Sequence, residues 1–187
     1  MSVRLPPKRL VALDFETAVS MDHAIEIGCA EMVNGRLTGN VYHQFVRPLV
    51  PINVFAQAVH GISDRSLARM PTFAQVVDAF MDFIGDAGIV AHGEHVERSI
   101  LAKEFSRIGR QQLDPQRFVC TLAMARRSGL FARNGLRAVC GDLRINVEAL
   151  RDGHHDAVGD AKMSALVYLH LIGKPIASRA TPTRVGS

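Results

Sequence analysis

The stretch RLVALDFET (residues 9–17) holds the strongest structural signal in the chain. It starts as a short apolar run, which is typical of a buried strand. It ends in two acids, Asp14 and Glu16, on either side of Phe15. Because side chains alternate across a strand, residues 14 and 16 point toward the same face of a sheet. The stretch therefore predicts a strand that carries two carboxylates to one site.

A β-hairpin is predicted after this strand. Apolar and polar residues alternate over 24–29 and 41–46, and between them lies Asn34-Gly35, a pair that favours a two-residue turn. Helices and short strands then alternate. Spacing and capping residues predict helices over 73–84, 94–108 and 157–172, shorter helices near 53, 63, 127 and 134, and strands over 88–91 and 117–121. This order predicts an α/β fold, a mixed β-sheet flanked by helices on both faces.

The length and composition are those of a single soluble domain. The chain has 187 residues, 48% of them apolar. We expect the domain to span residues 10–173, between an N-terminal extension (1–9) and a disordered basic tail (174–187). No apolar run has the length of a signal peptide or a membrane span, so we expect a cytoplasmic protein that does not contact membranes. The 3 cysteines are far apart and form no C-x-x-C pair, which predicts reduced, buried thiols.

Charge is distributed unevenly along the chain. Residues 11–97 contain 11 acidic and 4 basic side chains, whereas residues 98–151 contain 11 basic and 4 acidic ones. One half could hold cations and the other phosphates, since a guanidinium grips phosphate through two parallel hydrogen bonds. The pattern does not select individual arginines as phosphate ligands, and solvated helix faces rich in arginine would give the same counts.

Two further acids are predicted to join Asp14 and Glu16. Glu97 extends the apolar stripe of its helix by one turn, and Asp160 lies one turn into the last helix, so both should face the sheet. Clustered carboxylates repel one another, which requires either protonation or a metal ion. Oxygen ligands without thiolates select Mg²⁺ or Mn²⁺, and a pair of such ions is a known clamp for phosphoryl displacement.

His155 comes five residues before Asp160, at the expected start of the last helix. An imidazole titrates near neutral pH, so this side chain is suited to take a proton from an attacking water. Ordinary structural explanations remain for each residue alone. The first two acids could line an exposed edge strand, Glu97 could serve the helix dipole, Asp160 could be a surface acid, and His155 could be solvated beside His154.

The chain resembles the DEDDh family of 3′-to-5′ exonucleases, over roughly residues 10–173. The first family motif, Asp-x-Glu-Thr, is matched by Asp14 to Thr17, and the third, His-x4-Asp, by His155 to Asp160. The segments VHGIS (59–63) and FVCTL (118–122) resemble further landmarks. The resemblance implies a ribonuclease-H-like fold, two divalent metal ions held by Asp14, Glu16, Glu97 and Asp160, and release of nucleoside 5′-monophosphates.

The second family motif differs in this chain. The family reads Val-Ala-His-Asn-x-x-Phe-Asp, whereas the segment VAHGEHVE (90–97) has Gly93 for the asparagine and Glu97 for the aspartate. A glutamate is one methylene longer and can still reach a metal, although a displacement of about 1 Å can slow catalysis on the order of 100-fold. A second hypothesis is therefore an impaired nucleic-acid-binding or polymerase-associated module of the same fold.

The expected substrate is an unpaired 3′ end of DNA or RNA, with DNA favoured. Through the resemblance, Phe15, Thr17 and His60 match family positions that contact the terminal nucleotide. Phe15 could equally belong to the core, because on a strand it points away from its acidic neighbours. A DNA polymerase subunit is a further expected partner. The sequence does not decide between DNA and RNA, since that choice depends on contacts with the ribose 2′-hydroxyl.

Overall fold

The computed structural model describes residues 9–151 and 156–173. His155 lies outside the described residues, and so do residues 1–8 of the expected extension and the expected tail from 174 onward. Arg9, which we assigned to the extension, is already the first residue of a strand. The remaining domain limits stay a prediction.

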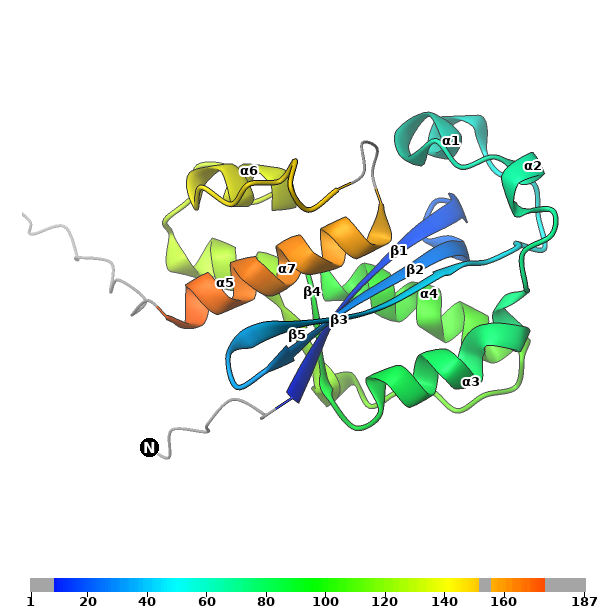
Figure 1. The fold of residues 1–187 in the computed structure, drawn as a ribbon, viewed down its shortest axis with the longest axis horizontal. Helices are drawn as coiled ribbons and strands as arrows, with labels where there is room; N and C mark the ends of the chain where they lie inside the picture. The colour runs from blue at the N-terminus through cyan, green and yellow to red at the C-terminus, as the bar shows by residue number, and fades with distance from the viewer. Residues whose placement is uncertain (1–8, 152–155, 174–187) are drawn as a thin grey trace, which may run out of the picture.

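A five-stranded sheet forms the centre of the molecule (Figure 1). Its strands are β1 (Arg9–Val19), β2 (Asp22–Val33), β3 (Arg36–Phe45), β4 (Gly88–Ala91) and β5 (Phe118–Cys120). They are ordered β3-β2-β1-β4-β5, with β1, β2 and β3 antiparallel and with β4 and β5 parallel to β1. The mixed sheet predicted from the sequence is confirmed.

The predicted hairpin joins β2 to β3. Asn34 and Gly35 have φ angles of 51° and 75°, as a tight turn of this kind requires at both central positions. The turn lies beside the start of β1, since Val33 pairs with Arg9. It therefore lies at the end of the sheet where β1 begins, away from Asp14 and Glu16.

The helices begin and end close to the predicted residues. They are α1 (Val54–His60), α2 (Asp64–Leu67), α3 (Phe73–Ile84), α4 (Glu94–Arg107), α5 (Thr121–Ser128), α6 (Leu136–Asp142) and α7 (Ala157–Ile172). Thr72 and Gln75 form a capping box at the start of α3, and Gly85 ends that helix. α6 begins later than expected, because Gly135 rather than Asn134 is its N-cap. Among the described residues, no helix combines the length and apolarity needed to cross a membrane.

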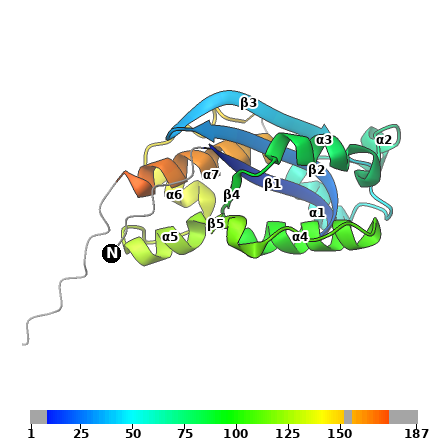
Figure 2. The same cartoon turned by 90° about the horizontal axis from the view of Figure 1, so that it is seen from below.

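Helices cover both faces of the sheet, as the two views in Figures 1 and 2 show. The alternation along β1 separates two cores. Val11, Leu13 and Phe15 pack with apolar residues of α3 and α4, whereas Leu10 and Ala12 belong to a second cluster with α7. Asp14 and Glu16 share the parity of the second set, so they point toward the face that α7 covers.

The start of α7 lies directly against β2. A Cβ atom added to Gly28 would be 2.1 Å from the carbonyl carbon of Ala157 and 2.3 Å from the backbone nitrogen of Val158. These are backbone atoms, which cannot rotate away as a side chain would. Only glycine at position 28 lets α7 approach β2 this closely, and this approach determines how far Asp160 lies from β1.

We predict that Gly28→Ala lowers the free energy of unfolding by about 3 kcal/mol, because a methyl group in this contact must displace a helix. Urea denaturation would measure the change. Gly141→Ala in α6 is a matched control, since a Cβ there meets no atom within 4 Å. Equal stability of the two variants would contradict the close packing of α7 on β2.

Candidate active site

Three carboxylates meet where β1 and α7 approach each other. Asp14 and Glu16 come from β1 and Asp160 from the first turn of α7, and one oxygen from each lies within 4.8 Å of the others. The register of β1 against β2 shifts between Glu16 and Thr17, as at a β-bulge, and the pairing continues beyond it. The structure therefore brings together three of the four acids predicted as metal ligands in one compact group.

Glu97, the fourth predicted ligand, comes from the first turn of α4. It is not part of the 4.8 Å group, but its side chain is buried at 5% exposure and its charge acts on Asp14. Its Oε2 atom is buried and accepts no hydrogen bond among the described residues. Of the acids that raise the Asp14 pKa, Glu97 has the largest effect. Glu97 thus borders the three-acid group from the α4 side, with an oxygen available to a cation.

Burial and neighbouring charges raise the pKa values of three of these acids. Burial holds the pKa of Asp14 well above its usual range, and the charges of Glu97 and Asp160 raise it further. Burial and then Asp160 raise the pKa of Glu16 to about 8, and burial raises that of Glu97 to about 7. Such a group gains most from a cation that replaces its protons. The donor set consists of oxygens, so the residues fit a hard divalent ion such as Mg²⁺ or Mn²⁺.

Arg151 is a site residue that the sequence did not single out. Its side chain is buried, with 2% exposure, and forms an ion pair with Asp160. The same guanidinium lowers the pKa of Glu16, which counteracts part of the repulsion from the other acids. Its ion pair with Asp160 could not be predicted from the sequence. Arg151 is one of many arginines in residues 98–151 and is separated from α7 by residues 152–155.

Glu26 was also missed. It lies opposite Glu16 in the β1–β2 pairing, is 2% exposed, and is 2.7 Å from His43 Nε2. Its carboxylate also accepts a hydrogen bond from the backbone N–H of Ala157, the first residue of α7. In the alternating pattern of β2, Glu26 could not be distinguished from the other polar residues of the strand. Only the position of α7 shows that this face of β2 is buried.

His92 connects the β4–α4 loop to the segment before α6. Its Nε2–H donates to the Asn134 carbonyl at 2.8 Å, and its Nδ1 lies 2.9 Å from the Thr121 hydroxyl, which also donates to the Ala91 carbonyl at 3.2 Å. Burial lowers the His92 pKa, in keeping with a neutral ring. Gly93 follows with φ 107°, a conformation that a side chain would strain. The altered second motif therefore forms an ordered loop that leads directly into Glu97.

The residues expected to contact substrate lie in different surroundings. Phe15 is 7% exposed and packs edge-on to Phe80 with ring centres 6.2 Å apart, which favours the core interpretation for its side chain. Thr17 is partly buried at the end of β1. His60 ends α1, is buried, and accepts the Ile62 N–H at Nδ1. Figure 1 shows α1 and the start of α7 at the same end of the sheet.

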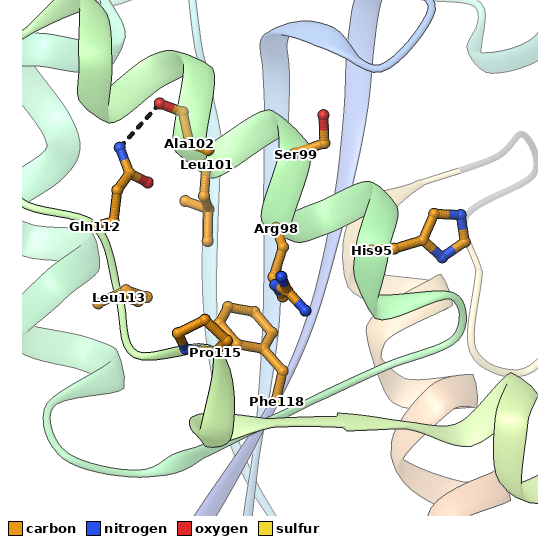
Figure 3. A pocket seen from close by; sticks show the side chains of 9 residues that line it. All are labelled: His95, Arg98, Ser99, Leu101, Ala102, Gln112, Leu113, Pro115 and Phe118. Atoms are coloured by element: carbon orange, nitrogen blue, oxygen red, sulfur yellow. Dashed lines mark hydrogen bonds between the residues drawn. The ribbon is translucent and has the colours of Figure 1, made fainter.

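A separate hollow of about 330 Å³ lies between α4 and the segment before β5 (Figure 3). Both apolar and polar side chains line it, and the Arg98 guanidinium is 6.0 Å from the centre of the Phe118 ring. None of the four acids lines this hollow. This hollow is therefore not the candidate active site, which is marked by the group of carboxylates.

Together, the sheet and its acidic group define an α/β protein of the ribonuclease-H-like class with a site suited to divalent cations. The family model described as Exonuclease (RNase_T) matches residues 11–168, and the chain belongs to this family. DNA polymerase III subunit epsilon of Escherichia coli K12 is 38% identical over 152 residues, which are 80% of this chain and 62% of that protein. The Pasteurella multocida protein of the same name is 36% identical over 177 residues, 89% of this chain and 69% of that one. The chain thus spans less than two thirds of the Escherichia coli relative.

Solved structures show the same fold at low sequence identity. Exonuclease X in complex with 5′ overhanging duplex DNA superposes with a TM-score of 0.72 at 23% identity, covering 88% of this chain and 91% of that one. The nuclease domain of 3′hExo, a DEDDh family member bound to rAMP, gives a TM-score of 0.70 at 17% identity, covering 89% and 92%. The predicted fold class and family resemblance are confirmed.

We predict that the metal-free protein loses stability as pH rises from about 5 to 8. The folded pKa values of Glu16 (about 8) and Glu97 (about 7) lie above the unfolded value of about 4.3, so folding favours the protonated acids. This stabilisation is complete below the unfolded value and is lost as pH rises through the folded values. Mg²⁺ or Mn²⁺ should accordingly raise the Tm more at pH 8 than at pH 5.

Thermal unfolding in EDTA and in millimolar Mg²⁺ at both pH values would measure this effect. Glu16→Gln should weaken both the pH dependence and the metal effect, whereas Asp142→Asn, at an exposed acid of α6, should change neither. A wild-type Tm that responds equally to Mg²⁺ at both pH values would contradict the pKa assignments.

Proposed function

We propose that this chain is a metal-dependent 3′-to-5′ exonuclease that hydrolyses the terminal phosphodiester bond of single-stranded nucleic acid and releases nucleoside 5′-monophosphates. The observation that carries the proposal is the group of Asp14, Glu16 and Asp160 within 4.8 Å, bordered by buried Glu97. Membership of the exonuclease family supports it.

The four acids would hold two Mg²⁺ or Mn²⁺ ions. Bound there, such ions stabilise negative charge on the phosphate and promote deprotonation of water. Asp14 is central to this arrangement, since the charges of Glu97, Asp160 and Glu16 all act on it. The substitution of glutamate for aspartate in the second motif is compatible with this role, because Glu97 is buried and its charge acts on Asp14.

His155 is proposed to take the proton from the attacking water. It stands five residues before Asp160, and a neutral imidazole is the usual acceptor at neutral pH. Arg151 would keep the Asp160 carboxylate in place through its ion pair. In this proposal the chain supplies both a proton acceptor and a positioned ligand for the reaction.

The terminal nucleotide would lie between the acids and α1. Val54, Phe55 and Val59 of α1 are exposed at 70%, 80% and 52%, an unusual amount of apolar surface for one short helix. Bases of an unpaired end can pack on such side chains whatever their sequence. Thr17 and His60 lie nearby, at the end of β1 and of α1, and are proposed to contact the same nucleotide.

DNA is the proposed substrate, in association with a DNA polymerase. The support comes from the relatives, which carry the name DNA polymerase III subunit epsilon. RNA ends are the alternative substrate, supported by the nuclease domain of 3′hExo, which has a similar fold and was solved bound to rAMP. An impaired binding module remains the second functional hypothesis.

Digestion of a 5′-labelled single strand would test the proposal. We predict a ladder that shortens from the 3′ end in Mg²⁺ or Mn²⁺, faster for DNA than for RNA. Asp14→Ala should abolish it, because this substitution removes the acid at the centre of the group. Binding of the strand without any shortening would instead support the impaired module.

We predict that His155→Ala slows hydrolysis by about 100-fold or more while metal binding is largely retained, as expected for a proton acceptor that is not a main ligand. Single-turnover rates and Mn²⁺ titration would give the two quantities. His154→Ala is the matched control and should retain the wild-type rate. An unchanged rate in His155→Ala would remove this residue from the mechanism.

A further inference from the structure

A second, more open hollow of about 530 Å³ adjoins the acidic group. Its wall includes Asp160, one of the clustered acids, together with Arg133, Arg137 and Arg151. The other lining residues are small or apolar and belong to the start of α6. A site for cations thus opens into a space bordered by three guanidinium groups.

The three arginines differ in their burial and in their interaction partners. Arg151 is buried on Asp160, so it forms the inner end of the hollow. Arg133 and Arg137 are exposed at the rim. Arg137 Nη2 is 3.8 Å from Glu148, but both side chains are largely solvated, and such a pair contributes little. No described residue forms an ion pair or hydrogen bond with the Arg133 guanidinium.

The segment that carries Arg133 is fixed relative to the acids. The hydrogen bond from His92 to the Asn134 carbonyl, 2.8 Å long, ties the residue after Arg133 to the loop before α4. That same loop leads into the first turn of α4 and so to Glu97. The Arg133 backbone and the Glu97 carboxylate are therefore held by one set of contacts, although the two residues are far apart in sequence.

We propose that this hollow binds the backbone phosphate next to the scissile one, on its 5′ side in the single strand. Arg133 and Arg137 are the proposed ligands of this phosphate. The inference rests on the proposed exonuclease function. A phosphodiester carries one negative charge and oxygens that accept paired N–H groups, which is the geometry a guanidinium offers. The acids alone would repel this phosphate. The two arginines near Asp160 would attract the phosphate and so direct the strand away from the acids.

Binding of a labelled DNA single strand by fluorescence anisotropy, with Ca²⁺ in place of Mg²⁺, would test the proposal. Arg133→Ala and Arg137→Ala should each weaken binding by about fivefold at low salt. Each should also reduce the slope of log affinity against log salt concentration by about 0.7, the value for one phosphate contact in a single strand.

Two arginines serve as matched controls. Arg36→Ala removes an exposed arginine at the far end of the sheet, and Arg98→Ala removes the arginine of the other hollow. Both should bind like the wild type. If the two rim variants bind like Arg36→Ala, or if Arg98→Ala has the larger effect, the strand does not follow this hollow and the proposal is wrong.

A small substrate separates this proposal from the exonuclease function itself. The p-nitrophenyl ester of thymidine 5′-monophosphate has a scissile phosphate but no neighbouring one. Arg133→Ala should lower kcat/KM for an oligonucleotide about fivefold and leave that for the ester unchanged, and an equal loss on both would overturn the phosphate assignment. If the wild type hydrolyses neither substrate, the exonuclease function fails, while the anisotropy measurement still decides the role of the hollow.

Discussion

The repulsion among partly or fully buried carboxylates is the constraint on which the site depends. Asp14, Glu16 and Asp160 lie within 4.8 Å of one another, and Glu97 adds a further charge beside Asp14. Burial and the charges of neighbouring acids raise the pKa values of Asp14 and Glu16, and burial raises that of Glu97, so the folded protein holds these groups together with protons, with Arg151, or with added cations. Placing acids in this way lowers the stability of the folded protein but raises its affinity for cations. This is the exchange expected at a site for phosphoryl chemistry.

A few close contacts within the fold hold the acids in these positions. Gly28 lets the backbone of α7 lie against β2, and Glu26 accepts the N–H of Ala157 at the start of the same helix. The first turn of α7 is thereby held next to β1, with Asp160 facing Asp14. On the other side, His92 fixes the loop before α4 and with it Glu97. Three chain segments that are distant in sequence are thus joined at one end of the sheet.

Much of the fold could be predicted because its signals are local. The apolar run before Asp14, the turn at Asn34-Gly35 and the capping box at Thr72 each specify their own element, and the structure contains all of them. The alternation rule also placed Asp14 and Glu16 on one face. Arg151 and Glu26 could not be recognised in this way. Their roles come from tertiary contacts with α7, and a lone arginine or a polar residue in a strand has the same appearance in any sequence.

A crystal structure with Mn²⁺, with data collected at the manganese absorption edge, would test the central claim most directly. The account predicts two anomalous peaks between β1 and α7, with oxygens of Asp14, Glu16 and Asp160 around them and Glu97 Oε2 among the ligands. Peaks located elsewhere, or a Glu97 side chain turned away from both ions, would contradict the convergence of these acids on a shared pair of cations.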